Sequence, residues 1–385
     1  MKKLQIFLNK TSSIVSMLFR NCFGKSSASI SKVRRVLVLE LWGIGDVVLA
    51  SGVLQLLKGS YPSLEMTLLA KRHSRDILLN NKCVDKFVFF DFPWTKFKRK
   101  YNFLKWNFTN LFKLICALRK EKFDLVLDAR GDFRNNFFSF LINAKWRVGY
   151  NWTGGGYFLT DVLKCDYRNL HRVDAWANLI RHIGVEDSDI KPVIKISEEE
   201  KRWANEFLKS KGLNKKKLLI GIHPGARIKT RCWPLERFSK VASYLMQGDS
   251  QVIIFIEPDD YGQDMQVPDG CIKVKVNLRD FMSLTKELDF LVCNDGGAMH
   301  IAVAVQTPVV ALFGPMDPVW FGPYGDGNIV VIREDIPCRP CFDYCKHKEA
   351  YCLTSITEEQ VIKQIDVMIR NTRKVNNGSV GEVIK

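Results

Sequence analysis

Short apolar runs that alternate with helical patterns are the feature of this sequence that most constrains its fold. They form two series, one in each half of the chain: 35–41, 65–70, 86–90 and 124–130, then 218–225, 252–257, 290–295 and 309–314. Each run is continuously apolar rather than alternating, as expected for parallel strands that helices cover on both faces. The sequence therefore predicts an α/β fold with two Rossmann-like domains, whose parallel sheets face a central cleft.

Polar stretches and turn residues divide the chain of 385 residues into five predicted segments. The join between the halves is expected near 186–197, which is polar and contains Pro192. Thr357 and Gln360 form a capping-box pattern that begins a last helix. The predicted segments are a basic amphipathic or disordered extension (1–32), an N-terminal domain (33–190), a C-terminal domain (191–355), a C-terminal helix (356–372) and a flexible tail (373–385).

The positive charge of the chain is concentrated in two segments. Of the net charge of +17, residues 1–35 and residues 94–122 each supply +8, and the remainder is close to neutral. Local basic surfaces of this kind suit docking on phosphate-rich or anionic partners. No nucleic-acid-binding motif accompanies them, so we predict an anionic membrane surface as a partner and not a nucleic acid.

The sequence disfavours both membrane spanning and export. No apolar run reaches the ~18 residues needed to cross a bilayer. In the first 25 residues, Asn9 and Lys10 interrupt the apolar stretch and no clean cleavage site follows. Eleven cysteines, an odd number, favour a reducing compartment. We expect a cytoplasmic protein that attaches peripherally to a membrane, with residues 1–25 forming either an interfacial helix or a disordered extension.

A polar turn follows the first predicted strand. Residues 43–46, Gly-Ile-Gly-Asp, end that strand and open a helix, which places Asp46 at a helix N-terminus beside the expected cleft. An aspartate there either caps the helix, which stabilises it by about 1 kcal/mol, or acts in catalysis, and the sequence leaves both interpretations open. The turn lacks the G-x-G-x-x-G dinucleotide fingerprint, so nicotinamide binding is not expected.

Two further polar turns follow strands of the second half. The first holds the cations Lys229 and Arg231, which either neutralise a diphosphate or belong to a solvated loop that Trp233 anchors. The second, "NDGGAMH" (294–300), places flexible glycines at a strand-to-helix junction, a geometry that receives phosphate at a helix N-terminus. His300 in this turn is either a ligand-binding histidine or a buried structural one.

Four cysteines near the C-terminus follow the pattern C-x2-C-x3-C-x6-C: Cys338, Cys341, Cys345 and Cys352. Four thiolates can bind Zn²⁺ tetrahedrally, but the pair of C-x2-C knuckles typical of structural zinc sites is absent. The alternatives to structural zinc are free thiols or a redox-sensitive loop. We predict no catalytic metal and no cofactor.

Three motifs, taken in order, resemble glycosyltransferase family 9, the ADP-heptose:lipopolysaccharide heptosyltransferases. They are "GDVVL" (45–49), "HPGA" with "WPLERF" (223–238), and "NDGGAMHIAVAVQTPVVALFGPMDP" (294–318). The resemblance covers about 35–372 and implies a GT-B fold. It also implies a nucleotide-sugar donor held by the C-terminal domain and a lipid-linked glycan acceptor held by the N-terminal domain.

The resemblance implies roles for single residues as well. Asp46 matches the catalytic base. The donor-binding segment matches Asp295, Gly296, Gly297 and His300. The chain departs from the family at two positions, because Arg231 stands where Lys is usual and Gly296 where Ser or Thr is usual. A guanidinium is a planar fork rather than a point charge, and a glycine lacks the hydroxyl donor, so both departures bear on the identity of the donor sugar.

The predicted reaction is an inverting, metal-independent transfer of heptose from ADP-heptose to the lipid A or core region of lipopolysaccharide. It is expected at the cytoplasmic face of the inner membrane. Asp46 takes the proton of the acceptor hydroxyl, while cationic side chains and helix N-termini stabilise the leaving diphosphate. The expected donor-binding residues are Lys229, Arg231, Asp295, Gly296, Gly297 and His300, and the expected acceptor-binding residues are Gly45, Arg130 and Arg134.

Other functions share some of these features. A transferase that moves another nucleotide sugar onto a surface glycan, or a nucleotide-sugar epimerase, would use the same fold and donor site. Isomerisation of the sugar without an acceptor would identify the epimerase. A nucleic-acid-binding module would account for the net charge of +17, but the confinement of that charge to two segments disfavours it.

The basic segment 94–120 carries an apolar stripe. Seven residues recur at alternating spacings of four and three, which predicts one helix: Phe97, Tyr101, Leu104, Phe108, Leu111, Ile115 and Leu118. Lysines and additional aromatic residues surround the stripe, a composition that suits the boundary between lipid headgroups and acyl chains. We expect this segment to face the membrane and the acceptor. The alternative is a helix packed on the sheet with a solvated basic face.

Overall fold

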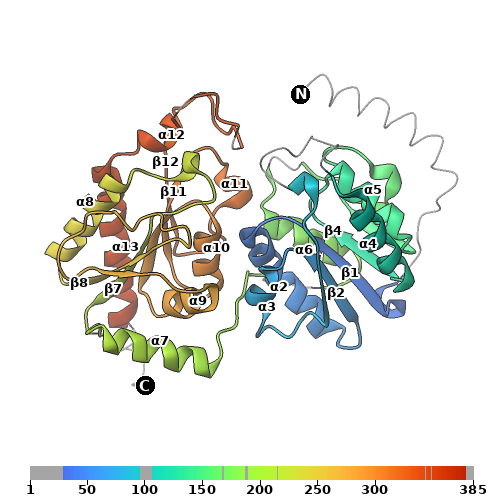
Figure 1. Cartoon of the computed structure of the whole chain (residues 1–385), viewed down its shortest axis with the longest axis horizontal. Coiled ribbons are helices and arrows are strands. Elements are labelled where there is room, and N and C mark those ends of the chain that lie inside the picture. Colours follow the sequence, from blue (N-terminus) through green and yellow to red (C-terminus); the bar gives the residue numbers. More distant parts are fainter. Residues whose placement is uncertain are drawn as a thin grey trace. The chain divides into compact units, whose positions relative to one another are not determined.

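The structure is a computed structural model that describes residues 29–95, 106–166, 169–186, 190–214, 216–342, 344–347 and 349–378, with side chains as far as Lys374. The chain divides into two compact units, residues 1–190 and residues 191–385 (Figure 1). Each unit is a parallel β-sheet with helices on both faces. The predicted α/β class is therefore confirmed.

The N-terminal unit contains a six-stranded parallel sheet with the order β3-β2-β1-β4-β5-β6. Residues 36–39 of its central strand are at most 1% exposed, which explains why that run is continuously apolar. The strands are β1 (Arg35–Glu40), β2 (Glu65–Ala70), β3 (Lys86–Phe89), β4 (Leu125–Asp128), β5 (Trp146–Gly149) and β6 (Asp161–Val162).

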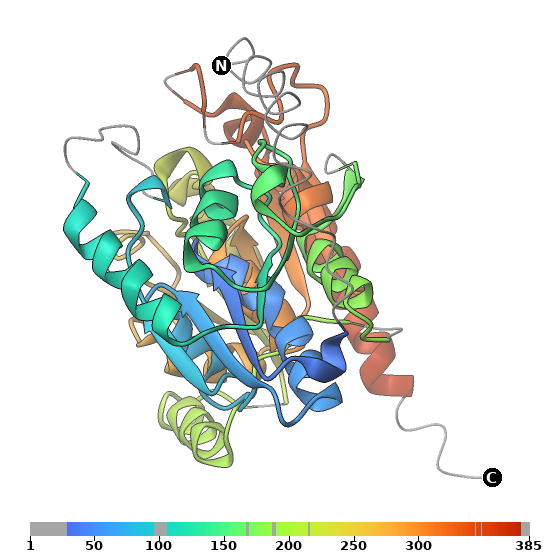
Figure 2. The same ribbon diagram turned by 90° about the vertical axis from the view of Figure 1, so that its right-hand side faces the viewer.

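Five α-helices lie between or after these strands in the described part of the unit. They are α2 (Ile44–Ser60), α3 (Ser74–Leu78), α4 (Phe108–Lys120), α5 (Phe133–Ile142) and α6 (Arg172–His182). Helices α3 and α6 pack against α2 on one face of the sheet, whereas α4 and α5 pack together on the other (Figures 1 and 2). Single 3₁₀ turns add η1 (Ile30–Lys32), η2 (Pro93–Thr95) and η4 (Gly156–Phe158).

The C-terminal unit repeats this plan with the strand order β12-β11-β10-β7-β8-β9. Its strands are β7 (Leu218–His223), β8 (Ser250–Phe255), β9 (Ile272–Val274), β10 (Phe290–Asn294), β11 (Val309–Phe313) and β12 (Ile329–Ile332). Its helical elements are α7 (Glu198–Ser210), η6 (Lys229–Arg231), α8 (Leu235–Gln247), α9 (Leu278–Lys286), α10 (Gly297–Ala304), α11 (Pro318–Phe321), α12 (Tyr351–Thr354) and α13 (Glu358–Gly378). Helix α13 thus extends beyond the predicted 356–372, into what was expected to be tail.

Each parallel sheet has one switch point, where the order in which successive strands are added to the sheet reverses. In the N-terminal unit the strands proceed one way from β1 and the other way from β4, and in the C-terminal unit the same happens at β7 and β10. The loops that leave these neighbouring strand ends lead to helices on opposite faces of the sheet. Open α/β sheets bind their ligands at such points.

The predicted single helix over 94–120 is wrong. Trp94 lies in the 3₁₀ turn η2 and is buried in the core, and α4 begins only at Phe108, where the side chain of Asn107 caps it. Within α4, Leu118 is buried and Leu111 and Ile115 pack against the core, whereas Phe108, at the start of the helix, is exposed. Three further stripe residues, Phe97, Tyr101 and Leu104, lie outside the described residues, as do residues 1–28.

No helix within the described ranges is both long and apolar enough to cross a membrane.

Candidate active site

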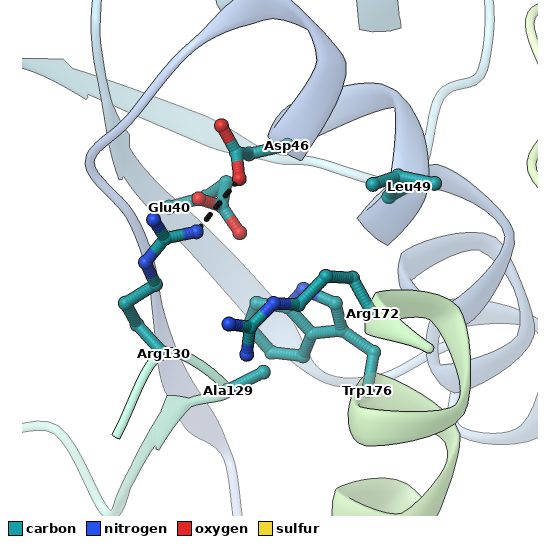
Figure 3. A pocket seen from close by; sticks show the side chains of 7 residues that line it. All are labelled: Glu40, Asp46, Leu49, Ala129, Arg130, Arg172 and Trp176. Atoms are coloured by element: carbon teal, nitrogen blue, oxygen red, sulfur yellow. Dashed lines mark hydrogen bonds and ion pairs between the residues drawn. The ribbon is translucent and has the colours of Figure 1, made fainter. Parts of the chain in front are cut away.

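A pocket lies at the switch point between β1 and β4 of the N-terminal unit (Figure 3). Its walls come from the ends of both strands, from the first turn of α2 and from the start of α6. The lining residues are Glu40, Asp46, Leu49, Ala129, Arg130, Arg172 and Trp176. Two acidic and two basic side chains therefore face one small space.

Asp46 lies in the first turn of α2, directly after Gly45, and both oxygens of its carboxylate accept hydrogen bonds. Its Oδ2 accepts a hydrogen bond from the backbone N–H of Gly43 at 3.0 Å, which caps the helix. Its Oδ1 accepts a hydrogen bond from Nη1 of Arg130, also at 3.0 Å. The carboxylate therefore serves as a cap and still lines the pocket, so the two interpretations of this residue do not exclude each other.

Arg130 joins the two sides of the switch point. Its backbone N–H donates to Oδ1 of Asp128 at 3.3 Å, which fixes the turn after β4. Its guanidinium carbon lies 4.3 Å from the ring centroid of Trp42, within the range of a cation–π contact. The guanidinium is thus held between this ring and the carboxylate of Asp46.

Arg134, which was predicted alongside Arg130, has a different partner. Its Nε and Nη2 donate to the carboxylate of Asp132 at 2.8 and 2.6 Å, in the first turn of α5. Burial raises the pKa of Asp132, but the hydrogen bonds and charge of Arg134 outweigh it and hold that pKa below its usual value. Of the two predicted acceptor cations, only Arg130 lines the pocket.

Glu40 and Arg172 line the pocket although the sequence analysis did not single them out. Burial, followed by the charge of Asp46, raises the pKa of Glu40 well above its usual value, and the indole of Trp176 donates to this carboxyl. Burial, followed by the charge of Arg130, lowers the pKa of Arg172 to about 9, so Arg172 remains protonated at neutral pH. Figure 3 shows the Arg172 side chain reaching from α6 into the space below Glu40.

Asp128 is a third carboxyl beside this pocket, fully buried at the end of β4. Its Oδ1 accepts hydrogen bonds from Asn135 Nδ2 at 3.1 Å and from the Arg130 backbone, while its Oδ2 has no hydrogen-bond partner among the described residues. Burial raises the pKa of Asp128 to about 7. This carboxyl therefore holds its proton to a much higher pH than an exposed aspartate does.

The turn after Asp128 requires a glycine. Gly131 has a φ of +63°, and a Cβ there would lie 2.9 Å from side-chain atoms of both Trp152 and Tyr150. The ring of Trp152 in turn lies 4.7 Å from the guanidinium carbon of Arg172. The Trp152 ring thus packs closely on the backbone of Gly131 and makes the cation–π contact with Arg172.

In the C-terminal unit, Asn294 organises the switch point between β7 and β10. Its Oδ1 accepts a hydrogen bond from the backbone N–H of Trp233 at 3.0 Å, and its Nδ2 donates to the carbonyl of Pro224 at 2.6 Å. The Trp233 ring is fully buried, and its Nε1 donates to the Ile356 carbonyl at 2.9 Å. The loop after β7 is therefore anchored at Trp233.

The two predicted donor-binding cations of that loop differ in their surroundings. Arg231 lies 3.2 Å from the carboxylate of Asp295, and these side chains are only 17% and 3% exposed. Lys229, in the same 3₁₀ turn, is exposed to solvent. Arg231 and Asp295 are thus brought together as an internal ion pair, whereas Lys229 presents its charge to the outside of the loop.

Helix α10 begins at Gly297, two residues after Asp295, and has no side-chain cap at its N-terminus. Gly296, at the N-cap, has an extended backbone, and a Cβ there would meet no atom within 4 Å. His300 is buried, at the end of the first turn that starts with Gly297. The N-terminal backbone N–H groups of α10 therefore lie beside an open space at position 296, where a serine side chain would also fit.

His223 and Glu257 also line this strand edge, and the sequence analysis did not name them as site residues. His223 ends β7, and its Nε2 lies 3.7 Å from Oε1 of Glu257, two residues beyond β8. Burial lowers the pKa of His223 even though the charge of Glu257 opposes this. A Cβ on Gly225 would lie 2.2 Å from the Glu257 carboxylate, so this position needs a glycine.

The cysteine-rich loop carries free thiols in the structure, with Cys338 exposed and Cys352 buried. Burial raises the pKa of Cys352 to about 11. Across the described ranges, no group of three or more His, Cys, Asp or Glu side chains is arranged to hold a metal ion. Arg339 donates to the carbonyls of Gly314 and Met316 and so fixes this loop to the end of β11.

The chain matches the family model "Glycosyltransferase family 9 (heptosyltransferase)" over residues 111–352. It is 25% identical to the lipopolysaccharide core heptosyltransferase OpsX of Haemophilus influenzae over 311 residues, which cover 77% of this chain and 84% of that protein.

Two solved structures share the architecture. A glycosyl transferase family 9 protein from Veillonella parvula is 26% identical, with a TM-score of 0.71 over 88% of this chain and 97% of that one. The ADP-heptose lipopolysaccharide heptosyltransferase II of Escherichia coli is 19% identical, with a TM-score of 0.66 over 88% and 99% of the two chains. The predicted GT-B class, with two parallel-sheet α/β units, is thus confirmed.

Proposed function

The chain belongs to glycosyltransferase family 9, the heptosyltransferases, and from this membership we propose that it transfers heptose from ADP-heptose to the core region of a lipopolysaccharide. Relatives named as lipopolysaccharide or lipooligosaccharide heptosyltransferases, each 23–25% identical to this chain, support this choice of donor and acceptor. Differences from the family at single residues, such as Gly296, bear most directly on the identity of the donor sugar.

The observation that carries the proposal is the position of Asp46. It is the one carboxylate lining the N-terminal pocket that keeps a guanidinium partner, and its side chain is 21% exposed. The other lining carboxyl, Glu40, is buried and driven towards its neutral form. A general base must be reachable by the hydroxyl that it deprotonates, and the partly exposed Asp46 meets this condition whereas the buried Glu40 does not.

In the proposed reaction, the acceptor hydroxyl oxygen attacks the anomeric carbon of the donor sugar. The new carbon–oxygen bond forms as the bond from that carbon to the diphosphate oxygen breaks, and its electron pair leaves with the diphosphate. The hydroxyl proton passes to Asp46. Because attack comes from the side opposite the leaving group, the configuration at the anomeric carbon inverts in a single displacement.

We assign the donor to the β7/β10 switch point of the C-terminal unit. The backbone N–H groups at the start of α10 carry partial positive charge, which suits the diphosphate, and Lys229 adds an exposed cation on the neighbouring loop. The Glu257 carboxylate, held at a strand end, suits the ribose hydroxyl groups of a nucleotide. Arg231 acts by holding Asp295 in place beside the α10 N-terminus.

With these charges supplied by the chain itself, we propose that the transfer needs no metal ion. The test is a transfer assay with the purified full chain, ADP-heptose and a heptose-deficient lipopolysaccharide, which follows release of ADP with and without EDTA. We expect ADP release that depends on the acceptor and is unchanged by EDTA. ADP-heptose that isomerises or stays intact in the presence of acceptor would refute the transferase assignment, and loss of activity in EDTA would refute metal independence alone.

We further propose peripheral attachment to the cytoplasmic face of the inner membrane through the outer face of α4, which would bring the lipid-linked acceptor close. Phe108 and Phe112, one helical turn apart, are 56% and 66% exposed. Lys113, Arg119 and Lys120 are exposed on the same helix, which contains no acidic residue. Exposed phenylalanines beside cations match the requirements of an interface rich in anionic lipids.

A further inference from the structure

A buried chain of hydrogen bonds leads from the core of the N-terminal unit to the proposed base. The indole Nε1 of Trp94 donates to Oδ1 of Asn135 at 3.1 Å, and Nδ2 of Asn135 donates to Oδ1 of Asp128 at 3.1 Å. The same oxygen of Asp128 accepts from the backbone N–H of Arg130 at 3.3 Å, and Nη1 of Arg130 donates to Asp46 at 3.0 Å (Figure 3). Successive contacts thus connect η2 to the first turn of α2.

The contacts of Asn135 allow only one orientation of its amide group. An indole nitrogen only donates hydrogen bonds, so the amide oxygen must face Trp94. The amide NH₂ group then faces Asp128, whose oxygen accepts from it. An aspartate at position 135 could still accept from Trp94, but it would offer no donor to Asp128 and would set two carboxyl groups side by side. The position therefore needs a side chain whose two ends differ.

The hydrogen-bond chain lowers the stability of the fold. Asp128 and Asn135 are fully buried, and Oδ2 of Asp128 has no hydrogen-bond partner among the described residues. Burial raises the pKa of Asp128 to about 7, which shows that the site disfavours the ionised carboxylate. Apolar side chains of similar volume would fill this space without an unsatisfied polar atom. Stability therefore does not account for the two residues, and the groups that they fix must be considered instead.

The hydrogen-bond chain fixes the turn that follows β4. The Asp128 side chain accepts from the backbone two residues further on, as in an Asx turn, and Gly131 follows with a φ of +63°. The backbone of Arg130 is therefore held on both sides. Its guanidinium, anchored in this way, lies against the carboxylate of Asp46 and 4.3 Å from the ring centroid of Trp42.

Resting on the proposed transferase function, we propose that Asp128 and Asn135 are positioning residues for the transfer. They fix the backbone of Arg130, and the Arg130 guanidinium in turn holds the carboxylate of Asp46 in one orientation. A displacement of about 1 Å can lower the rate of a reaction about 10²-fold, so the orientation of a base contributes to turnover as well as its presence. Neither Asp128 nor Asn135 lines the pocket, so both act through Arg130.

The first test needs no transfer activity. In the full chain labelled with ¹⁵N-arginine, hydrogen exchange of the Arg130 backbone N–H is measured, and its signal is assigned by its absence in Arg130→Lys. Asp128→Ala and Asn135→Ala should each raise this exchange rate at least about tenfold. Asp128→Asn keeps the accepting oxygen and should stay near the wild-type rate.

The internal control for this measurement is the backbone N–H of Arg147, which donates to Oγ1 of Thr160 in the same unit and reports general loosening of the fold. Its exchange should not change in any of the three variants. Unchanged exchange at Arg130 in both alanine variants overturns the proposal. A rise of equal size at Arg147 also overturns it, because Asp128 and Asn135 would then stabilise the unit as a whole.

The second test asks whether Asn135 acts through Arg130. Turnover of ADP-heptose with a heptose-deficient lipopolysaccharide is compared for Asn135→Ala, Arg130→Gln and the double variant. Asn135→Ala should lower kcat about tenfold and leave KM for the donor unchanged, and it should hardly lower kcat further in the Arg130→Gln background. Ser139→Ala is the matched control, because Ser139 is fully buried one turn later on α5 and its hydroxyl donates to the Asn135 carbonyl. It should keep the kcat of each background.

The results of this cycle separate the inference from the proposed function. Wild-type kcat in Asn135→Ala, or reductions by Asn135→Ala and Arg130→Gln that multiply in the double variant, would overturn the positioning role while the transferase function stands. A wild-type chain that transfers no heptose would refute the proposed function, whereas hydrogen exchange at Arg130 decides separately whether Asp128 and Asn135 fix its backbone.

Discussion

The guanidinium of Arg231 lies 3.2 Å from the carboxylate of Asp295, and this ion pair joins the loop after β7 to the end of β10. Beside it, Asn294 accepts a hydrogen bond from the Trp233 backbone across 61 residues of sequence. The two contacts fix the loop and the strand end relative to each other. The N-terminus of α10, which follows at once, is thereby held at the switch point of the C-terminal sheet.

Arg231→Ala should lower the unfolding free energy of the protein, and its effect on ADP affinity should be the smaller one. The change leaves Asp295 buried without its cation, and breaking such a pair costs about 3 kcal/mol or more of unfolding free energy. Arg231→Lys should lose less, because the charge stays. Lys229→Ala, in the same turn but exposed, should leave the denaturation midpoint unchanged and weaken ADP binding in calorimetry. If Arg231→Ala unfolds like the wild type and only ADP affinity falls, Arg231 is a direct ligand of the diphosphate instead.

Asp46→Asn should retain the fold and donor binding but lose most turnover. The carboxamide oxygen can still accept from the Gly43 backbone and cap α2, but it cannot take the proton of the acceptor. Loss of a general base lowers kcat by about 10²- to 10⁴-fold. Asp85→Asn, which removes a carboxylate paired with Lys58 in the same unit, is the control and should keep its kcat. Wild-type turnover in Asp46→Asn would leave this residue with the role of a helix cap only.

The stability of the chain should carry a pH dependence from Asp128. Burial raises its pKa in the folded state from 3.8 to about 7, so the folded protein binds more protons than the unfolded one between these values. Stability therefore falls as pH rises through this window, by at most about 1.4 kcal/mol per pH unit from this group. Asp128→Asn should flatten the dependence of unfolding free energy on pH between about 4 and 7.

The control for that experiment is Asp132→Asn. The pKa of Asp132 is held below its usual value, so its contribution has the opposite sign, present above the unfolded pKa and lost as pH falls through the folded one. Removing Asp132 should therefore alter the acid side of the profile. Identical slopes for wild type and Asp128→Asn would mean that Asp128 is ionised in the folded protein.

The outer face of α4 should contribute to membrane binding without contributing to stability. Phe108→Ser combined with Phe112→Ser removes two side chains that are more than half exposed, so the melting temperature should hardly change. Sedimentation with liposomes containing anionic lipid should weaken, and high salt should weaken it further in the wild type. Leu79→Ser, at another exposed apolar position of the unit, should have no effect. Full binding by the double variant would exclude this face as the attachment site.

The architecture was predictable because buried parallel strands leave a strong signal. All eight apolar runs named from the sequence overlap a strand of the structure, and Asp46, Asp295 and His300 could be placed at strand-to-helix junctions from local pattern alone. The pairing of side chains across the sheet was not predictable in the same way. Nothing in the sequence around Arg130 distinguishes it from Arg134, yet one reaches Asp46 and the other turns back to Asp132.

Glu40, Asp128 and Glu257 were missed although the sequence carries a usable signal for them. Each is an acid at or just beyond the carboxyl end of an apolar run, where parallel sheets bind ligands. Arg172 offered no such signal, because it comes from α6, whose path back to β1 depends on tertiary packing. The apolar stripe over 94–120 led to a wrong prediction because the helical spacing of apolar residues extends across Asn107. The helix α4 begins only after this residue, whose side chain caps it.

The proposed transfer is tested most directly by mass spectrometry of lipopolysaccharide from three strains. One lacks the gene for this protein, and the other two are the same strain complemented with either the wild-type gene or the Asp46→Asn variant. Without the protein, the core should be shorter, and its mass should lack a heptose together with everything attached beyond it. The wild type should restore the full mass, whereas Asp46→Asn, produced at the same level, should not. A lipopolysaccharide of unchanged mass in cells without the protein, or full restoration by Asp46→Asn, would contradict the proposed transfer or the proposed base.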